Sequence, residues 1–315
     1  HNLTESYIDS LEKAEKTPTL NYLDQEIIID EITQKKATFS EQDLLFNVAV
    51  QSARAGLNAQ QAEEFWQNTL YSNDVLPLQN EGVYTRLFTT REIINTEQLM
   101  LNNAQFLARR SSTHFTEKNI IDAIKNAEVI LGFTFDDEQR EAIFGTLASG
   151  DFCITQGSAG AGKTTLMLAA KIAYQNQNLS VKGACVAKKA ADNLTQETGI
   201  HTHTISSLVT AIENNRHPLS SVDVLVLDEA GQVSSTDLTT LLYEAKVSQC
   251  KLILTGEDKQ LDAINRGGAL RYLSKPEIVG TQRIENIRRQ RQVWAKQVVA
   301  DLRDGRSIAA VNSLQ

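Results

Sequence analysis

The hydrophobic positions of this chain follow two patterns. In the second part, short apolar runs recur at residues 152–155, 180–186, 222–227 and 251–255, and segments with helical spacing separate them. Alternation of apolar strands with helices is typical of a parallel sheet that is covered by helices on both faces. In such folds the ligand site lies at the carboxyl ends of the strands. We therefore predict an α/β domain over residues 115–315, with its site at that edge of the sheet.

The first part of the chain has a mostly helical spacing of apolar positions. Residues 1–37 are polar with scattered apolar positions, which predicts a helical lead-in or linker. Ser40 precedes the next helical segment, and Asp43 stands at the spacing of a capping box. Asn58 is the expected cap of a further helix. We therefore expect two consecutive helices, which begin after Ser40 and Asn58.

A segment rich in β-forming residues interrupts this helical region. Residues 82–90 alternate between apolar and polar positions, which predicts a hairpin or wing, and residues 91–110 return to helical spacing. Two helices, a wing and a long helix predict a small α-rich domain over residues 38–114, a possible relative of winged-helix domains. Such domains bind DNA in some proteins and serve only as packing modules in others, and the sequence leaves both open.

The first apolar strand of the second part leads into a glycine-rich segment, GSAGAGKT, at residues 157–164. It matches G-x-x-x-x-G-K-[ST] at every fixed position, between a strand and the start of a helix, so the flanks disfavour a chance glycine-rich turn. Glycines let backbone N–H groups face phosphate oxygens, and the helix N-terminus adds partial positive charge. The segment predicts an ATP site with Mg²⁺. The residues that we expect to hold the nucleotide are Gly157, Gly160, Gly162, Lys163, Thr164 and Thr165.

A pair of carboxylates follows another apolar strand, about 64 residues after the glycine-rich segment. Asp228 and Glu229 come directly after residues 222–227. In a phosphate-loop fold this strand end lies beside the phosphates. Asp228 would hold Mg²⁺ together with Thr164, Glu229 would polarise the attacking water, and Lys163 would reach the β- and γ-phosphates.

Two glutamines add weaker signals. Gln139 lies on the helix before the glycine-rich strand, and its amide can donate to and accept from an adenine edge. Gln260 follows the strand at 251–255, where it could reach the γ-phosphate and report its loss. Neither glutamine is specific alone, because surface glutamines are common.

The order of these motifs resembles RecD-like superfamily 1 helicases, and more narrowly the helicase part of conjugative relaxases of the Ti-plasmid TraA / MobF type. Residues 134–295 carry the resemblance. Gln139 stands at the adenine-reading glutamine of that family, and Arg289 at its γ-phosphate arginine. The remaining motifs stand at residues 157–164 (motif I), 186–191 (Ia), 203–205 (Ib), 228–233 (II), 256–261 (III) and 287–294 (IV). The N-terminal segment around residues 84–100 also resembles a segment between relaxase and helicase in those proteins.

The resemblance implies a RecA-like motor domain of an ATP-dependent helicase or translocase that moves 5′→3′ on single-stranded DNA. The DNA contacts that it implies are Lys188, Lys189, Thr204 and Ser206. It also implies a second RecA-like domain as partner, with a relaxase domain upstream and a type IV secretion machine as further candidates. The chain begins with His1, so we expect a piece of a longer protein. We expect little or no unwinding by the chain alone, because motifs of the second motor domain have no counterpart before Gln315.

Two other functions stay open. One is a DNA-repair helicase of the RecD type, and the other is a non-catalytic module for single-stranded DNA binding or secretion recognition that keeps a phosphate-loop fold. The intact Lys163, Asp228 and Glu229 argue against a vestigial site. The chain departs from the family at Glu257, where Asp is usual, and at Lys188 and Lys189, where smaller residues are common.

Composition changes this picture little. The net charge is −8, which argues weakly against a surface coated with nucleic acid but allows a local basic track. From the sequence we expect neither a membrane-spanning segment nor a signal peptide. Cys153, Cys185 and Cys250 lie in or beside apolar runs and predict buried thiols, as in a bacterial cytoplasm. His201 and His203 form a His-x-His pair without a third ligand, so we do not expect a metal there.

Overall fold

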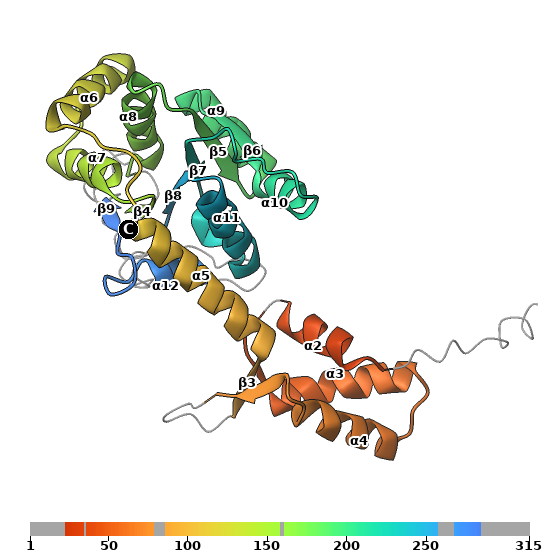
Figure 1. The fold of residues 1–315 in the computed structure, drawn as a ribbon. Helices are drawn as coiled ribbons and strands as arrows, with labels where there is room; N and C mark the ends of the chain where they lie inside the picture. Colours follow the sequence, from red (N-terminus) through yellow and green to blue (C-terminus); the bar gives the residue numbers. More distant parts are fainter. Residues whose placement is uncertain (1–22, 35, 79–85, 158–160, 258–267, 285–315) are drawn as a thin grey trace, which may run out of the picture. The chain divides into compact units, whose positions relative to one another are not determined.

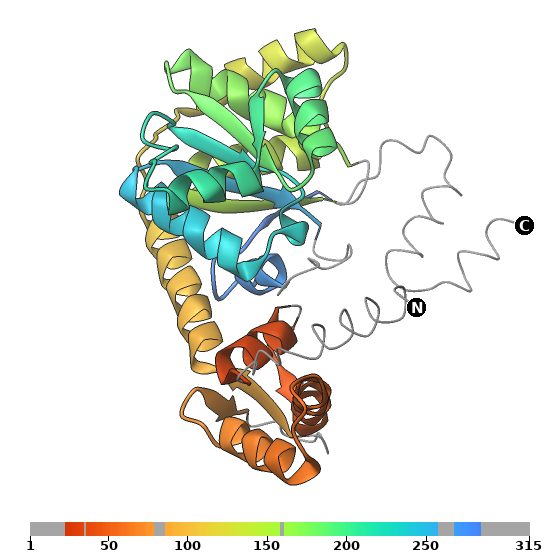
Figure 2. The ribbon, with the colours of Figure 1, turned by 90° about the vertical axis from the view of Figure 1, so that its right-hand side faces the viewer.

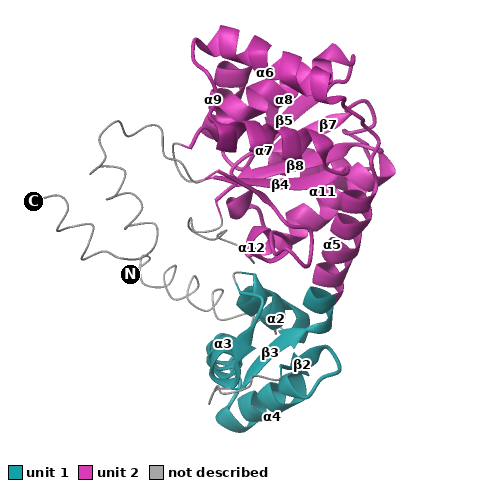
Figure 3. Cartoon of the chain, turned by 90° about the vertical axis from the view of Figure 1, so that its left-hand side faces the viewer, with its two compact units in different colours: residues 1–94 teal, residues 95–315 magenta. Residues whose placement is uncertain are grey.

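The chain forms two compact units, residues His1–Ile94 and Asn95–Gln315, which are coloured separately in Figure 3. The computed structural model describes residues 23–34, 36–78, 86–157, 161–257 and 268–284. Each unit has its own cluster of buried hydrophobic side chains. The two units are therefore described one at a time.

Unit 1 combines helices with a three-stranded antiparallel sheet (Figure 2). Its elements are α2 (Gln25–Thr33), β1 (Phe39–Ser40), α3 (Glu41–Arg54), α4 (Ala59–Leu70), β2 (Val75–Pro77) and β3 (Leu87–Thr90). β3 lies between β1 and β2, and the buried rings of Phe39 and Phe88 stack with their centroids 6.1 Å apart. The predicted β segment thus supplies the central strand of this sheet, although residues 79–85 lie outside the described residues. A winged-helix relationship is not shown by this arrangement and stays a prediction.

The helix starts that we predicted in unit 1 are confirmed. The Ser40 hydroxyl accepts a hydrogen bond from the Asp43 backbone N–H at 3.1 Å, and the Asp43 carboxylate accepts one from the Ser40 N–H at 2.8 Å. The Ser40 N–H lowers the pKa of Asp43, and so, to a smaller extent, does the Ser40 hydroxyl, which donates to the same carboxylate at 2.8 Å. Asn58 forms the corresponding box at α4. Residues 1–37 were predicted as a lead-in or linker. Within this segment, Ile28 and Ile29 of α2 belong to the hydrophobic core of unit 1, so α2 is part of that unit.

The division between the units falls within helix α5 (Arg91–Arg109). The buried side chains of Met100, Ala104 and Leu107 belong to the core of unit 2. We predicted the boundary between the domains at residue 114. The prediction was wrong because the helical spacing of apolar residues does not indicate which core the apolar face of the helix will pack against. Packing assigns most of this helix to the second unit.

Unit 2 is built on a six-stranded parallel sheet with strand order β6-β5-β7-β8-β4-β9 (Figure 1). The strands are β4 (Phe152–Gly157), β5 (Val181–Cys185), β6 (His201–Thr204), β7 (Val224–Leu227), β8 (Lys251–Gly256) and β9 (Gln282–Ile284). Its helices, besides α5, are α6 (Glu117–Leu131), α7 (Asp137–Ala148), α8 (Lys163–Asn176), α9 (Lys188–Thr198), α10 (Ile205–Glu213), α11 (Ser235–Val247) and α12 (Ala269–Leu273), with the short 3₁₀ turn η1 (Ala230–Gln232). This confirms the predicted α/β, RecA-like fold.

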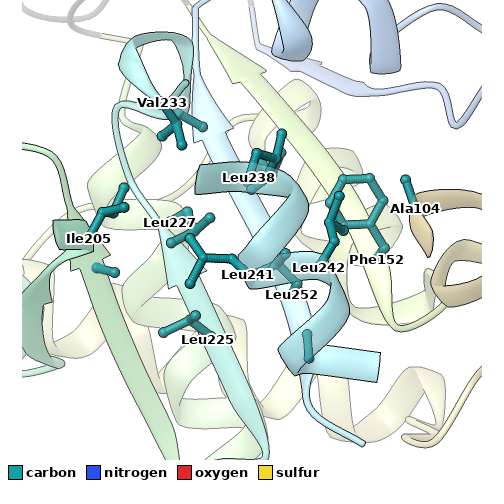
Figure 4. Packing of buried hydrophobic residues seen from close by; sticks show 14 of the residues in the cluster. Ala104, Phe152, Ile205, Leu225, Leu227, Val233, Leu238, Leu241, Leu242 and Leu252 are labelled. Carbon is teal, nitrogen blue, oxygen red and sulfur yellow. The ribbon is translucent and has the colours of Figure 1, made fainter. Parts of the chain in front are cut away.

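The strands bury both faces against helices. Phe152 and Leu252 pack with Leu238, Leu241 and Leu242 of α11 on one face (Figure 4). Alternate residues of the same strands belong to a second cluster, which contains side chains of α6, α7 and α8. Burial on both faces explains why the central strands read as continuous apolar runs.

The four strands predicted from apolar runs are present as β4, β5, β7 and β8. The sequence missed β6 and β9, which are the edge strands of the sheet. Both are rich in polar residues, since an edge strand keeps contact with water. In the described part of the chain, no helix is long and apolar enough to cross a membrane.

Buried charges lie at the amino end of the sheet. Asp151 is fully buried before β4 and accepts hydrogen bonds from the Ser112 N–H at 2.9 Å, the Ser112 hydroxyl at 2.7 Å and the Arg110 guanidinium. The buried Lys251 donates to the carbonyls of Thr146 at 3.2 Å and Ser149 at 3.0 Å, and burial lowers its pKa. These bonds tie the end of α5 and the end of α7 to the first residues of the central strands.

Replacing Asp151 by Ala should strongly destabilise unit 2. The side chain of Asp151 is 1% exposed, and its loss would leave Arg110 without its carboxylate. Breaking a buried pair costs about 3–5 kcal/mol of unfolding free energy. Urea unfolding measures this loss. The control is Asp192→Ala, which removes an exposed pair with Lys188 (side chains 62% and 73% exposed) and should cost about 0.5 kcal/mol. Equal losses in the two variants would contradict a structural role for Asp151.

Candidate functional site

The residues predicted at strand ends lie at one edge of the sheet. β4 leads into the glycine-rich loop, β7 ends before Asp228, and β8 lies between these two strands in parallel pairing. Because parallel strands run in one direction, their carboxyl ends share an edge, which is where ligands bind in such sheets. The structure therefore brings the glycine-rich loop and the carboxylate pair to the same edge.

The described ends of the glycine-rich loop are closely packed. Lys163 is the first residue of α8, and its ammonium donates to the carbonyl of Gly157. Gly162 precedes it with φ +94°, a left-handed conformation that favours glycine. A Cβ at Gly162 would lie 2.7 Å from the Gln139 amide nitrogen and 2.9 Å from the Thr165 hydroxyl. Glycine is thus required here, whereas Gly160 lies outside the described residues.

Gln139 and Thr165 both bind the loop itself. The Gln139 amide nitrogen donates to the carbonyl of Ala161 at 3.0 Å, and its oxygen accepts from the Asp136 N–H at 3.4 Å. Gln139 is 1% exposed. The Thr165 hydroxyl donates to the carbonyl of Gly162 at 2.6 Å. In this structure the amide of Gln139 holds the loop and caps α7; its role as an adenine reader stays a prediction.

The carboxylate of Asp228 is held through one of its oxygens. Oδ1 accepts the Glu229 backbone N–H at 2.9 Å and the hydroxyl of Thr255, which is buried near the end of β8. The Asp228 backbone N–H donates to Ala184 at 3.0 Å and extends the pairing of β5 with β7. The carboxyl group is therefore oriented by the neighbouring strand as well as by its own.

Negative charge gathers at this strand end. The thiol of Cys185, on the adjacent strand β5, is buried, and burial together with the charges of Asp228 and Glu229 raises its pKa to about 12. Cys185 therefore stays a neutral thiol, as predicted for a buried cysteine. A half-buried carboxylate in a negative potential is a suitable oxygen ligand for a hard cation such as Mg²⁺.

Two comparisons with known proteins decide the family. The family model described as "AAA domain" matches residues 134–315. This chain belongs to the AAA domain family. The probable conjugal transfer protein TraA of Sinorhizobium fredii is 33% identical over 287 residues, which cover 89% of this chain and 25% of that protein. The conjugal transfer protein TraA of Rhizobium radiobacter is 29% identical over 286 residues, with the same coverage.

The chain spans about a quarter of the length of these TraA relatives. They confirm the predicted resemblance to RecD-like proteins of the TraA type. Among solved structures, the Pif1 helicase from Candida albicans has a TM-score of 0.42 and 22% identity, over 55% of this chain and 44% of that one. The Pif1 of a Bacteroides species in complex with ADP-AlF4 has a TM-score of 0.39 and 18% identity, over 54% and 46%.

The residues predicted to contact DNA lie on two helix starts of this AAA domain. Lys188 and Lys189 open α9, and Thr204 caps α10, where its hydroxyl accepts from the Ser207 N–H at 3.4 Å. The Ser206 hydroxyl donates to the Thr204 hydroxyl at 3.4 Å.

His201, Lys182 and Lys188 lie near His203 in this part of the AAA domain. Burial, together with the charges of His201, Lys182 and Lys188, lowers the pKa of His203. The rings of His201 and His203 lie 4.7 Å apart between centroids. In the residues that the structure describes, no group of three or more His, Cys, Asp or Glu side chains is placed to hold a metal.

Gln260 and Arg289, like Gly160, lie outside the described residues. Two other residues of this edge were missed by the sequence analysis. Thr255 was read only as part of an apolar strand, although a hydroxyl at the end of such a strand signals a polar neighbour. Gln156 is 4% exposed on β4, and both polar atoms of its amide lack a partner in the described structure; we have no physical account of it.

Glu229 has a left-handed backbone, with φ +55°, which is strained for a residue with a side chain. Replacing it by Gly should raise the free energy of unfolding by about 0.5–1 kcal/mol, because glycine relieves the strain. Urea unfolding tests this. Gln249→Gly is the matched control, since Gln249 has φ +56° away from the site. If only the control is stabilised, contacts of the Glu229 side chain outweigh its strain.

Proposed function

We propose that this chain is a motor part of an ATP-dependent DNA helicase or translocase that acts on single-stranded DNA and belongs to a conjugative relaxase-helicase. One observation carries the proposal: the glycine-rich loop that ends at Lys163 lies at the same edge of the sheet as Asp228 and Glu229. The relatives support the conjugative assignment over DNA repair, because they are named conjugal transfer proteins.

ATP would bind at the carboxyl edge with its phosphates along the glycine-rich loop. Backbone N–H groups and the N-terminus of α8 favour negative charge there. Lys163 would exchange the carbonyl of Gly157 for phosphate oxygens, which are better partners for an ammonium because they are charged. The adenine contact of Gln139 is proposed from the family resemblance, and the bond of its amide to the carbonyl of Ala161 is compatible with a position near the loop.

The oxygen atoms of Asp228 and Thr164 are the proposed ligands of Mg²⁺. The neighbouring carboxylates of Asp228 and Glu229, whose charges add to burial in raising the pKa of Cys185, support a cation at this position. When bound, Mg²⁺ neutralises charge on the transferred phosphoryl group. Glu229 would orient the attacking water and take its proton, a role for which its carboxylate is placed directly after Asp228.

Gln260 and Arg289 complete the proposal as contacts of the γ-phosphate, on the basis of the family resemblance. Lys188, Lys189, Thr204 and Ser206 would hold the DNA backbone without reading sequence. We further propose a second RecA-like domain as the partner that closes on ATP, and 5′→3′ movement in the bacterial cytoplasm. A relaxase domain and a secretion machine are further proposed partners.

Changes at the phosphate loop should separate binding from hydrolysis. Lys163→Ala should abolish measurable ATP binding, because it removes the charge that faces the phosphates. Glu229→Gln should retain ATP binding and lower hydrolysis by about 100-fold or more, since it removes the general base. Fluorescent-nucleotide titration and phosphate release measure the two effects.

Lys125→Ala, an exposed change on α6, is the control and should match the wild type in both assays. Unchanged ATP affinity in Lys163→Ala would count against the phosphate-loop assignment. Unchanged hydrolysis in Glu229→Gln would contradict only the proposal that Glu229 is the general base.

Single-stranded DNA should stimulate hydrolysis if the chain is part of a motor. Lys189→Ala should weaken binding of a single-stranded oligonucleotide and reduce the dependence of log K on log salt by about 0.7, as expected for one lost phosphate contact. Fluorescence anisotropy at several salt concentrations measures this, with Lys125→Ala as control. DNA binding without any ATP hydrolysis, with a second RecA-like domain present, would favour the non-catalytic module.

A further inference from the structure

The strand between the two halves of the site carries a buried hydroxyl that contacts the acidic half. β8 pairs with β4, which leads to the phosphate loop, and with β7, which ends before Asp228. Thr255 is the last residue but one of β8 and is fully buried. Its hydroxyl donates to Oδ1 of Asp228.

Two donors converge on the same oxygen of Asp228. Oδ1 also accepts the Glu229 backbone N–H at 2.9 Å. A carboxylate oxygen has two lone pairs, so these donors occupy Oδ1. Among the residues that the structure describes, none donates to Oδ2. The hydroxyl of Thr255 and the Glu229 N–H thus hold Oδ1, and neither of them holds Oδ2.

The end of β8 also packs directly against the backbone that follows the carboxylate pair. A Cβ at Gly256 would lie 3.3 Å from the backbone nitrogens of both Ala230 and Gly231. The neighbouring strand therefore holds the acidic turn by a close backbone approach and by the Thr255 hydroxyl. The second of these contacts reaches the Asp228 carboxylate itself.

We infer that Thr255 is a positioning residue, which orients Asp228 so that Oδ2 faces the divalent cation bound with the nucleotide. This inference rests on the proposed function. Groups that orient metal ligands typically change metal affinity or activity by about 10–100-fold when they are removed. Thr255 itself contacts neither nucleotide nor cation in this role.

The chain contains a matched control for this residue. Thr155 on β4 is the direct partner of Thr255 across the parallel ladder and is also fully buried. Its hydroxyl meets the Thr146 hydroxyl of α7 at 2.9 Å, away from the acidic pair. Two threonines with the same burial and pairing thus differ in whether the hydroxyl reaches Asp228.

The experiment compares Thr255→Val, Thr255→Ser and Thr155→Val. Valine keeps the shape of threonine and removes the hydroxyl, and serine restores it. Binding of a fluorescent ATP analogue is titrated with Mg²⁺, and the urea midpoint of each variant shows that it is folded. We expect Thr255→Val to raise the Mg²⁺ concentration at half-saturation about 10–100-fold. Thr255→Ser should restore it to within a few-fold of the wild type, and Thr155→Val should match the wild type.

The outcomes separate the inference from the proposed function. If the wild type shows no Mg²⁺-dependent nucleotide binding, the proposed function fails. If the wild type binds and Thr255→Val needs no more Mg²⁺ than Thr155→Val, the positioning role of Thr255 is overturned. Thr255→Ala is titrated in the same way if the valine variant does not fold, and an unchanged Mg²⁺ requirement there overturns the inference equally.

Discussion

The candidate site depends on the parallel pairing of β8 between β4 and β7. Because the three strands run in one direction, the phosphate loop, the acidic pair and the Thr255 hydroxyl meet at one edge. Both faces of these strands are buried, so a slip of one residue would exchange the side chains of the two cores. The packing that stabilises the sheet therefore also sets the register of the site.

The two ends of the sheet use buried polar groups differently. At the amino end, Asp151 and Lys251 are fully buried, and their hydrogen bonds go to other parts of the protein. At the carboxyl end, Asp228 is only half-buried, and one of its oxygens takes both of the donated bonds. Charges of the first kind hold elements together, whereas a carboxylate of the second kind is suited to an external ligand.

Particular elements show why sequence reasoning succeeded or failed. The capping box of Ser40 and Asp43 is local in the chain, so these two residues, three positions apart, were enough to predict it. The edge strands β6 and β9 were missed because polar edge residues carry no apolar run. α5 was assigned to the first domain because the spacing of its apolar residues does not indicate which core they join. Met100, Ala104 and Leu107 belong to the core of unit 2.

The sequence by itself determined the α/β class, the four central strands and the phosphate loop with its acidic pair. These follow from the spacing of the glycine-rich motif and from apolar runs, which are properties of neighbouring residues. Only the tertiary structure decided that Gln139 holds the loop, that Thr255 holds Asp228, and where the two units divide. Those contacts join residues 22 and 27 positions apart. The first depends on the packing of α7 against the loop, and the second on the pairing of β8 with β7, so neither can be read from neighbouring residues.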